Sequence, residues 1–149
     1  MPKGPIIGAL HDDPTVTILE QLKRDEGVRH TAYQDTHGVW TVGVGHNLRV
    51  PLSDTAIEQI LADDLLAVDT ACRALPVWYQ LSPARQGVLL NMAFNVGFDG
   101  LLRFQKMFAA LRSGDYERAA VEMRDSLWAR QVGARADRLA KQMETDAWT

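Results

Sequence analysis

A change in residue periodicity near the start of the chain limits the fold more than any other feature of the sequence. Residues 28–46 are rich in strand-forming side chains and contain the turn sequence Asp35-Thr36-His37-Gly38, which together predict a β-hairpin. The segments before and after it carry apolar residues at helical spacing. One hairpin among several helices predicts an α+β protein in which a small β lobe packs against a mostly helical lobe.

Capping residues and helix breakers delimit the predicted helices. Gly27 is expected to stop the first helix, and Ser82-Pro83 forms an N-cap and first-turn pair for the third. The third helix is apolar on most sides, so we expect it to be the central buried helix. The sequence predicts helices over residues 15–26, 53–75, 83–96, 101–112, 116–132 and 134–143.

The composition fits one globular domain that follows a short extension. The chain has 149 residues, of which 46% are hydrophobic, an ordinary value for a globular domain. Residues 1–14 contain three prolines and show no periodicity, so they are predicted to form an N-terminal extension. Residues 15–149 are predicted to form a single domain with its β lobe at about 28–50. Cys72 is the only cysteine, which excludes an intrachain disulfide, and its helical context indicates a small core residue rather than a nucleophile.

The charge balance argues against a nucleic-acid-binding protein. The net charge is −3, from 16 basic and 19 acidic residues, whereas nucleic-acid binders carry a basic excess. Residues 1–99 hold 7 basic and 12 acidic residues, and residues 100–149 hold 9 and 7. The mildly basic C-terminal part fits either a surface that faces an anionic polymer or a solvated helical surface. No apolar run approaches the length of about 18 residues that a membrane helix needs, and the N-terminus does not resemble a signal peptide, so we expect no stable membrane insertion.

Glu26 is the most unusual polar residue of the first predicted helix. It continues the row of Ile18 and Leu22 by another four positions, so a carboxyl group extends an apolar helix face. It also ends the helix, where the macrodipole disfavours a negative charge. Both effects favour the neutral carboxyl, which could act as a general acid. The alternative is a helix-end glutamate that reaches solvent.

A second carboxyl group and a hydroxyl group lie in the predicted hairpin. Asp35 starts the turn, where it could either cap backbone N–H groups or face Glu26 across a cleft as the second carboxylate of a glycosidase. We expect Thr41, Gly43 and Gly45 on one face of a continuous second strand. The Thr41 hydroxyl could hold a water molecule or only serve strand propensity. The two glycines could admit another chain or a ligand, or only permit twist or a bulge.

The remaining polar motifs point to structural roles. His46 follows the glycines, but no second ligand lies at metal spacing, so we expect a structural role with Asp64 as an ion-pair partner. Gly43-Val44-Gly45 lacks the third glycine and the following helix of a phosphate-binding loop. No motif supports a Ser–His–Asp or Cys–His nucleophile.

Three segments together resemble the T-even phage lysozyme family of glycoside hydrolases. The first keeps that family's active-site spacing of a Glu, eight residues, an Asp, five residues and a Thr. The other two resemble its central helix and its C-terminal part, so the resemblance covers roughly residues 18–140. The segments are Glu26-Gly27-Val28-Arg29 through Tyr33-Gln34-Asp35-Thr36 and on to Gly38-Val39-Trp40-Thr41-Val42-Gly43-Val44-Gly45-His46; Asn91-Met92-Ala93-Phe94-Asn95-Val96-Gly97; and Ser126-Leu127-Trp128 with Gln131, Arg135 and Arg138.

The resemblance implies a lysozyme-like fold and a definite chemistry. Members of that family hydrolyse the β-1,4 bond between N-acetylmuramic acid and N-acetylglucosamine, and are described as inverting. The resemblance implies that Glu26 donates a proton to the glycosidic oxygen, that Asp35 orients or activates water, and that Thr41 helps to hold that water. Phe94 and Asn47 match positions where the family contacts the glycan, and no metal or organic cofactor is implied.

The resemblance also implies a biological setting. The expected partner is the glycan of bacterial peptidoglycan, and we expect a monomer that serves host-cell lysis. The enzyme would be made in the host cytoplasm and would reach the periplasm or cell wall at lysis through a holin. Asp25 with Arg138, and His46 with Asp64, would match structural ion pairs. The stretch from His46 to Asn91 is shorter than in the T-even enzymes, which implies a trimmed small lobe and a reduced groove wall.

Two other functions remain open on the sequence. A lytic transglycosylase also needs a catalytic glutamate but no carboxylate that activates water. A non-catalytic glycan-binding or structural phage module could lose Glu26 without harm. The joint presence of Glu26, Asp35 and Thr41 favours the hydrolase.

Overall fold

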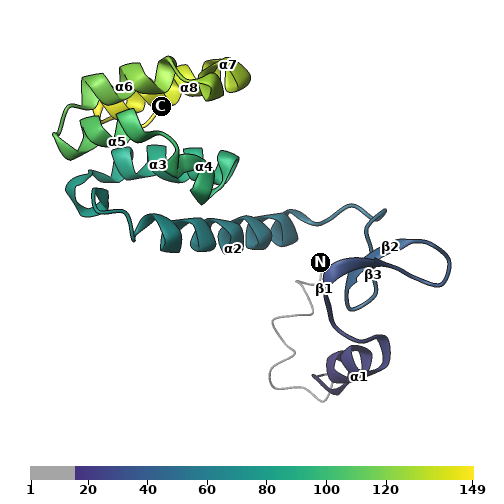
Figure 1. The fold of residues 1–149 in the computed structure, drawn as a ribbon. Coiled ribbons are helices and arrows are strands. Elements are labelled where there is room, and N and C mark those ends of the chain that lie inside the picture. Colours follow the sequence, from purple (N-terminus) through teal and green to yellow (C-terminus); the bar gives the residue numbers. More distant parts are fainter. Residues whose placement is uncertain (1–15) are drawn as a thin grey trace, which may run out of the picture. The chain divides into compact units, whose positions relative to one another are not determined.

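The computed structural model of the chain describes residues 16–149 (Figure 1). The chain divides into two compact units, Met1–Ala56 and Ile57–Thr149. The predicted extension over residues 1–14 lies outside the described residues, and the single domain over 15–149 stays a prediction. Within the described part of the chain, no helix is long and apolar enough to cross a membrane.

The described part of the first unit combines helix α1 and the start of α2 with a small antiparallel sheet. Helix α1 (Val16–Glu26) ends at Gly27, as predicted. Three strands follow in the order β1 (Arg29–Gln34), β2 (Trp40–Gly43) and β3 (His46–Asn47), each antiparallel to its neighbour. The α+β class predicted from the sequence is therefore confirmed.

The predicted continuous second strand is wrong beyond Gly43. The chain turns at Val44 and Gly45, and β3 then pairs back onto β2, with His46 opposite Val42. Gly43 and Gly45 both adopt positive φ, at 66° and 69°, which is the region where glycine avoids the Cβ penalty. Gly43 and Gly45 flank Val44 and reverse the direction of the chain there. The sheet therefore contains a third strand in addition to the predicted hairpin.

The second unit is helical. Helix α2 begins in the first unit and continues into the second, and α3 follows after a short 3-10 turn, η2. The bounds are α2 (Asp54–Cys72), η2 (Trp78–Gln80), α3 (Pro83–Val96), α4 (Phe98–Leu102), α5 (Gln105–Arg112), α6 (Tyr116–Arg124), α7 (Leu127–Val132) and α8 (Ala134–Thr145). The N-cap predicted at Ser82 is confirmed, since its side chain accepts from the Arg85 N–H at 3.3 Å. Asp115 caps α6 in the same way and accepts from the Arg118 N–H at 2.9 Å.

Two predicted helices are each broken in the structure. The helix predicted over 101–112 is interrupted at Phe104, which leaves helical geometry (φ −77°, ψ 56°) and sets its ring edge-on to Trp128. The helix predicted over 116–132 ends before Ser126, whose hydroxyl caps α7 by accepting from the Ala129 N–H at 3.1 Å. Apolar spacing continued across both breaks, so periodicity alone did not reveal them.

The buried apolar core of the described residues belongs to the second unit. Helix α3 packs against α4 and α8 and contributes Val88, Leu89 and Met92, each 0% exposed, so the prediction of a central buried helix is confirmed. Cys72 is also 0% exposed, and burial raises the pKa of its thiol to about 11. A thiol that stays protonated at neutral pH is a poor nucleophile, which agrees with its predicted core role.

Candidate active site

Glu26 is the last residue of α1, and the sheet begins three residues later at Arg29. Gly27 follows it with φ 76° and redirects the chain into β1. The glutamate side chain reaches the β2–β3 turn: a Cβ added to Gly45 would lie 3.5 Å from Glu26 Oε2. The Glu26 carboxyl group thus lies in van der Waals reach of Gly45, where the positive φ of 69° favours glycine.

The α1 face that carries Glu26 is open within the first unit. Glu26 is exposed. The two residues that it continues along the helix, Ile18 and Leu22, are 46% and 43% exposed. These exposed fractions describe the α1 face within the first unit, and the role of Glu26 as the acid stays a prediction.

Asp35 is held by the turn that it begins. Its Oδ1 accepts from the His37 N–H at 2.8 Å and from the Val39 N–H at 2.9 Å. The Val39 N–H lowers the pKa of the carboxyl, and the His37 N–H and the charges of His37 and Arg49 lower it further, which outweighs the opposing effect of burial. The lowered pKa keeps Asp35 ionised at neutral pH, so Asp35 has no proton to donate there.

Thr41 is the buried hydroxyl of the sheet. It is 4% exposed, pairs with Tyr33 on β1 and with Asn47 on β3, and donates its hydroxyl hydrogen to the Val39 carbonyl at 3.1 Å. Since that hydrogen is engaged, the oxygen can still offer an acceptor lone pair to another molecule.

Asp35 and Thr41 are joined through one backbone residue. The N–H of Val39 donates to Asp35 and its C=O accepts from Thr41. Val39 was not predicted from the sequence as part of the site, because its side chain carries no chemistry. The sequence feature that could have indicated Val39 is its position four residues after Asp35, because an Asp side chain in a turn can accept from a backbone N–H at that separation.

Two further predicted residues lie near this sheet. Asn47 in β3 is partly buried, and its Oδ1 accepts from the Arg49 N–H at 2.9 Å, so its side chain braces the following turn. His46 is partly buried, and its Nε2 has no hydrogen-bond partner among the described residues. Its predicted partner Asp64 belongs to the second unit, and this ion pair stays a prediction.

The other predicted glycan contact, Phe94, belongs to α3 of the second unit and is 43% exposed. Its neighbour Asn95 accepts from the indole N–H of Trp128 at 2.9 Å, which ties α3 to α7. Arg135 donates to Asn91 Oδ1 at 2.9 Å, which ties α8 to the same helix. The side chains around Phe94 are thus held in place, and its contact with glycan stays a prediction.

The comparison with known families decides the assignment. A model of the family described as phage lysozyme matches residues 23–145. The chain belongs to the phage lysozyme family. The resemblance drawn from the Glu, Asp and Thr spacing is thereby confirmed, and so is the interpretation of the chain as a lysozyme-type enzyme.

The relatives of this phage lysozyme family member include a phage spike protein, a probable lysozyme and a phage endolysin. It is 33% identical over 158 residues to the pre-baseplate central spike protein Gp5 of Enterobacteria phage T4, covering 86% of this chain but only 28% of that protein. It is 25% identical to the probable T4-type lysozyme 1 of Dictyostelium discoideum, covering 87% of this chain and 94% of the relative. It is 33% identical over 88 residues to the endolysin of Salmonella phage P22, covering 53% of this chain and 60% of the relative.

Proposed function

We propose that this chain is a muramidase that hydrolyses the β-1,4 bond between N-acetylmuramic acid and N-acetylglucosamine in bacterial peptidoglycan, with inversion. The observation that carries the proposal is the Val39 bridge, which holds an ionised Asp35 and an acceptor oxygen of Thr41 on one backbone unit. A glycosidase that activates water needs such a carboxylate in addition to its acid.

The proposed reaction divides two roles between two carboxyl groups. Glu26 donates its proton to the glycosidic oxygen as the bond to the anomeric carbon breaks. Asp35 takes a proton from the attacking water, whose oxygen bonds to the anomeric carbon on the opposite face, and Thr41 accepts a hydrogen bond from that water. A glycan strand bound over the exposed Glu26 excludes water from the reacting groups.

The products distinguish hydrolysis from lytic transglycosylation. Mass spectrometry of muropeptides released by the wild-type chain is expected to show reducing ends, and NMR of the fresh product is expected to show the inverted anomer. Glu26→Gln provides the inactive control. Products with 1,6-anhydro ends would replace the hydrolase by a transglycosylase, and no release by the wild type would favour a non-catalytic module.

The biological setting that we propose is host-cell lysis. The endolysin of Salmonella phage P22 and the endolysin of Acyrthosiphon pisum secondary endosymbiont phage 1, which is 29% identical over 108 residues, support it. In this role the enzyme accumulates in the host cytoplasm and meets the periplasm or cell wall through a holin. The match to the T4 spike protein supports a second setting, a lysozyme carried by the virion. Immunodetection in purified virions is expected to be negative for an endolysin and positive for a spike component.

A further inference from the structure

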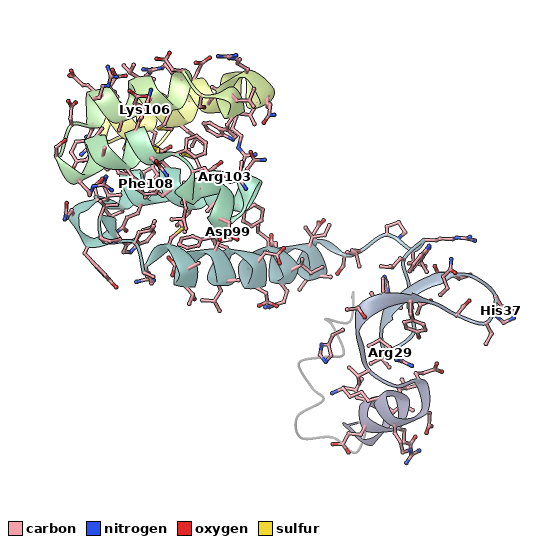
Figure 2. The ribbon with its side chains drawn as sticks, viewed as in Figure 1. Arg29, His37, Asp99, Arg103, Lys106 and Phe108 are labelled. Carbon is pink, nitrogen blue, oxygen red and sulfur yellow. The ribbon has the colours of Figure 1, made fainter. Side chains whose placement is uncertain are left out.

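The turn that holds the Asp35 carboxylate also carries an ionisable ring. Asp35 begins this turn, which closes where the Gly38 N–H donates to the Asp35 carbonyl at 3.0 Å. His37 is the third residue of the turn and lies at the tip of the β1–β2 hairpin (Figure 2). Since the His37 N–H donates to Asp35 Oδ1 at 2.8 Å, the residue that carries the imidazole also binds the carboxylate.

The His37 ring is held within the same turn by its neighbour. The Thr36 hydroxyl oxygen lies 3.3 Å from His37 Nδ1. A hydroxyl group can donate to this nitrogen when the ring is neutral and can accept from its N–H when the ring is protonated, so the contact is available to both charge states. His37 is exposed, and its ring can therefore exchange a proton with the solvent.

Two positively charged groups act on the Asp35 carboxylate, and they differ in permanence. The hydrogen bond from the Val39 N–H lowers the pKa of Asp35 most, and the charges of His37 and Arg49 lower it further. Arg49 follows β3 and keeps its charge at every relevant pH. Histidine gains and loses its proton between pH 5 and 8, so the charge of His37 depends on the medium.

Protonation of His37 changes the charge beside Asp35 without removing the hydrogen bond that places it. The bond comes from the backbone N–H, which is present in both states of the ring. A carboxylate beside an added cation holds a proton less strongly, which makes it a weaker base toward the attacking water. The proton on the imidazole comes from the solvent and returns to it, so the proposed reaction keeps its own balance of atoms.

We propose that His37 is a positioning residue whose ring charge regulates Asp35: the protonated ring weakens Asp35 as a base, so that turnover at mildly acidic pH is lower than a neutral residue at the same position would give. This inference rests on the proposed function, which assigns Asp35 to the attacking water. His37 acts through Asp35 and needs no contact with the glycan. The effect is therefore expected in kcat and not in KM.

The kinetic test compares the full chain with two variants on glycan strands from which the peptides have been removed. His37→Gln keeps the backbone N–H but carries no charge at any pH, and His37→Lys carries the charge throughout. At about pH 5.5, where histidine is largely protonated, we expect kcat to be about two- to threefold higher in His37→Gln than in the wild type. At about pH 7.5 these two are expected to be equal, and His37→Lys to be slower than both by a similar factor.

A second histidine of the same unit provides the matched control. His30 is exposed on β1, and its charge is not among those that lower the pKa of Asp35. His30→Gln is expected to match the wild type at both pH values. The same rise at low pH in His30→Gln, equal rates in His37→Gln and His37→Lys, or a change confined to KM would overturn the proposal. Because His37 is exposed, neither of its variants is expected to change the melting temperature.

NMR titration of the Asp35 carboxyl carbon separates this inference from the proposed function. In the wild type we expect a second inflection as His37 titrates. In His37→Gln that inflection is expected to vanish, and the Asp35 midpoint is expected to rise toward the ordinary pKa of 3.8. A wild-type chain that cleaves no glycan refutes the muramidase, and this titration still decides whether the His37 charge reaches Asp35. An identical Asp35 curve in the wild type and in His37→Gln would overturn the inference even in an active enzyme.

Discussion

The two units of this chain are held together by different physical means. In the second unit, 0%-exposed side chains such as Leu89, Met92 and Met123 form a closely packed apolar core. Among the described residues of the first unit, Thr41 alone is buried, and backbone hydrogen bonds hold Asp35 and Thr41. Positive-φ glycines set the turns next to these residues. The free energy of unfolding and the catalytic turnover are therefore expected to depend on separate sets of residues. Variants in each set can be compared by measuring both quantities.

The largest expected effect tests the chemical side of that comparison. Glu26→Gln keeps the shape of the side chain but removes the transferable proton, so turnover of peptidoglycan is expected to fall by about three to four orders of magnitude. The melting temperature is expected to stay unchanged, because Glu26 is exposed. A clearing assay on outer-membrane-permeabilised cells measures turnover, with Glu117→Gln, an exposed glutamate on α6, as the control. Lysis at the wild-type rate would eliminate Glu26 as the acid.

The stability side of the comparison is tested in α3. Leu89→Ala removes a side chain that is 0% exposed and leaves a cavity, so the free energy of unfolding is expected to fall by about 2–5 kcal/mol. Leu102→Ala is the matched control, because Leu102 is 43% exposed, and its loss is expected to be smaller. Urea denaturation measures both values. Turnover per folded molecule is expected to stay near the wild-type value, and a large fall would show that the core also shapes the active site.

Asp35→Asn separates charge from geometry within the first unit. The asparagine Oδ1 can accept the same two hydrogen bonds from His37 and Val39, so the turn is expected to form. The amide cannot take a proton from water, and turnover is expected to fall by about two orders of magnitude. Comparison of kcat and the NMR spectrum of the turn checks both expectations. Full activity in a folded variant would rule out Asp35 as the base.

The smallest expected effect concerns the pH dependence of stability. Hydrogen bonds from the Val39 and His37 N–H groups lower the pKa of Asp35 in the folded chain below its ordinary value of 3.8, so its carboxylate contributes stability that is fully present above that value. The contribution is lost as the pH falls through the lower folded pKa. NMR titration of the Asp35 carboxyl carbon is expected to give a midpoint below 3.8, and a midpoint above it would show that the Val39 and His37 bonds do not hold the anion.

Local chemistry explains why much of the fold was predictable. The N-caps at Ser82 and Asp115 and the helix stop at Gly27 act over one helical turn, and the structure has each of them where the sequence places it. The break at Phe104 was not predicted because apolar spacing continues across it, whereas in the structure its ring lies edge-on to Trp128, which is distant in sequence. The turn at Gly45 was missed because alternation of side chains continues smoothly through it.

The sequence by itself determined the α+β class, most helix boundaries and the spacing of Glu26, Asp35 and Thr41 that identifies the family. These depend on local propensity and on residue order, which the chain carries before it folds. Only the tertiary structure decided that Gly45 faces the Glu26 carboxyl, that Val39 joins Asp35 to Thr41, and that Asn95 ties α3 to α7. These contacts form when strand pairing and helix packing bring together atoms that are distant in sequence. Residue types and their spacing along the chain do not predict the distances between such atoms.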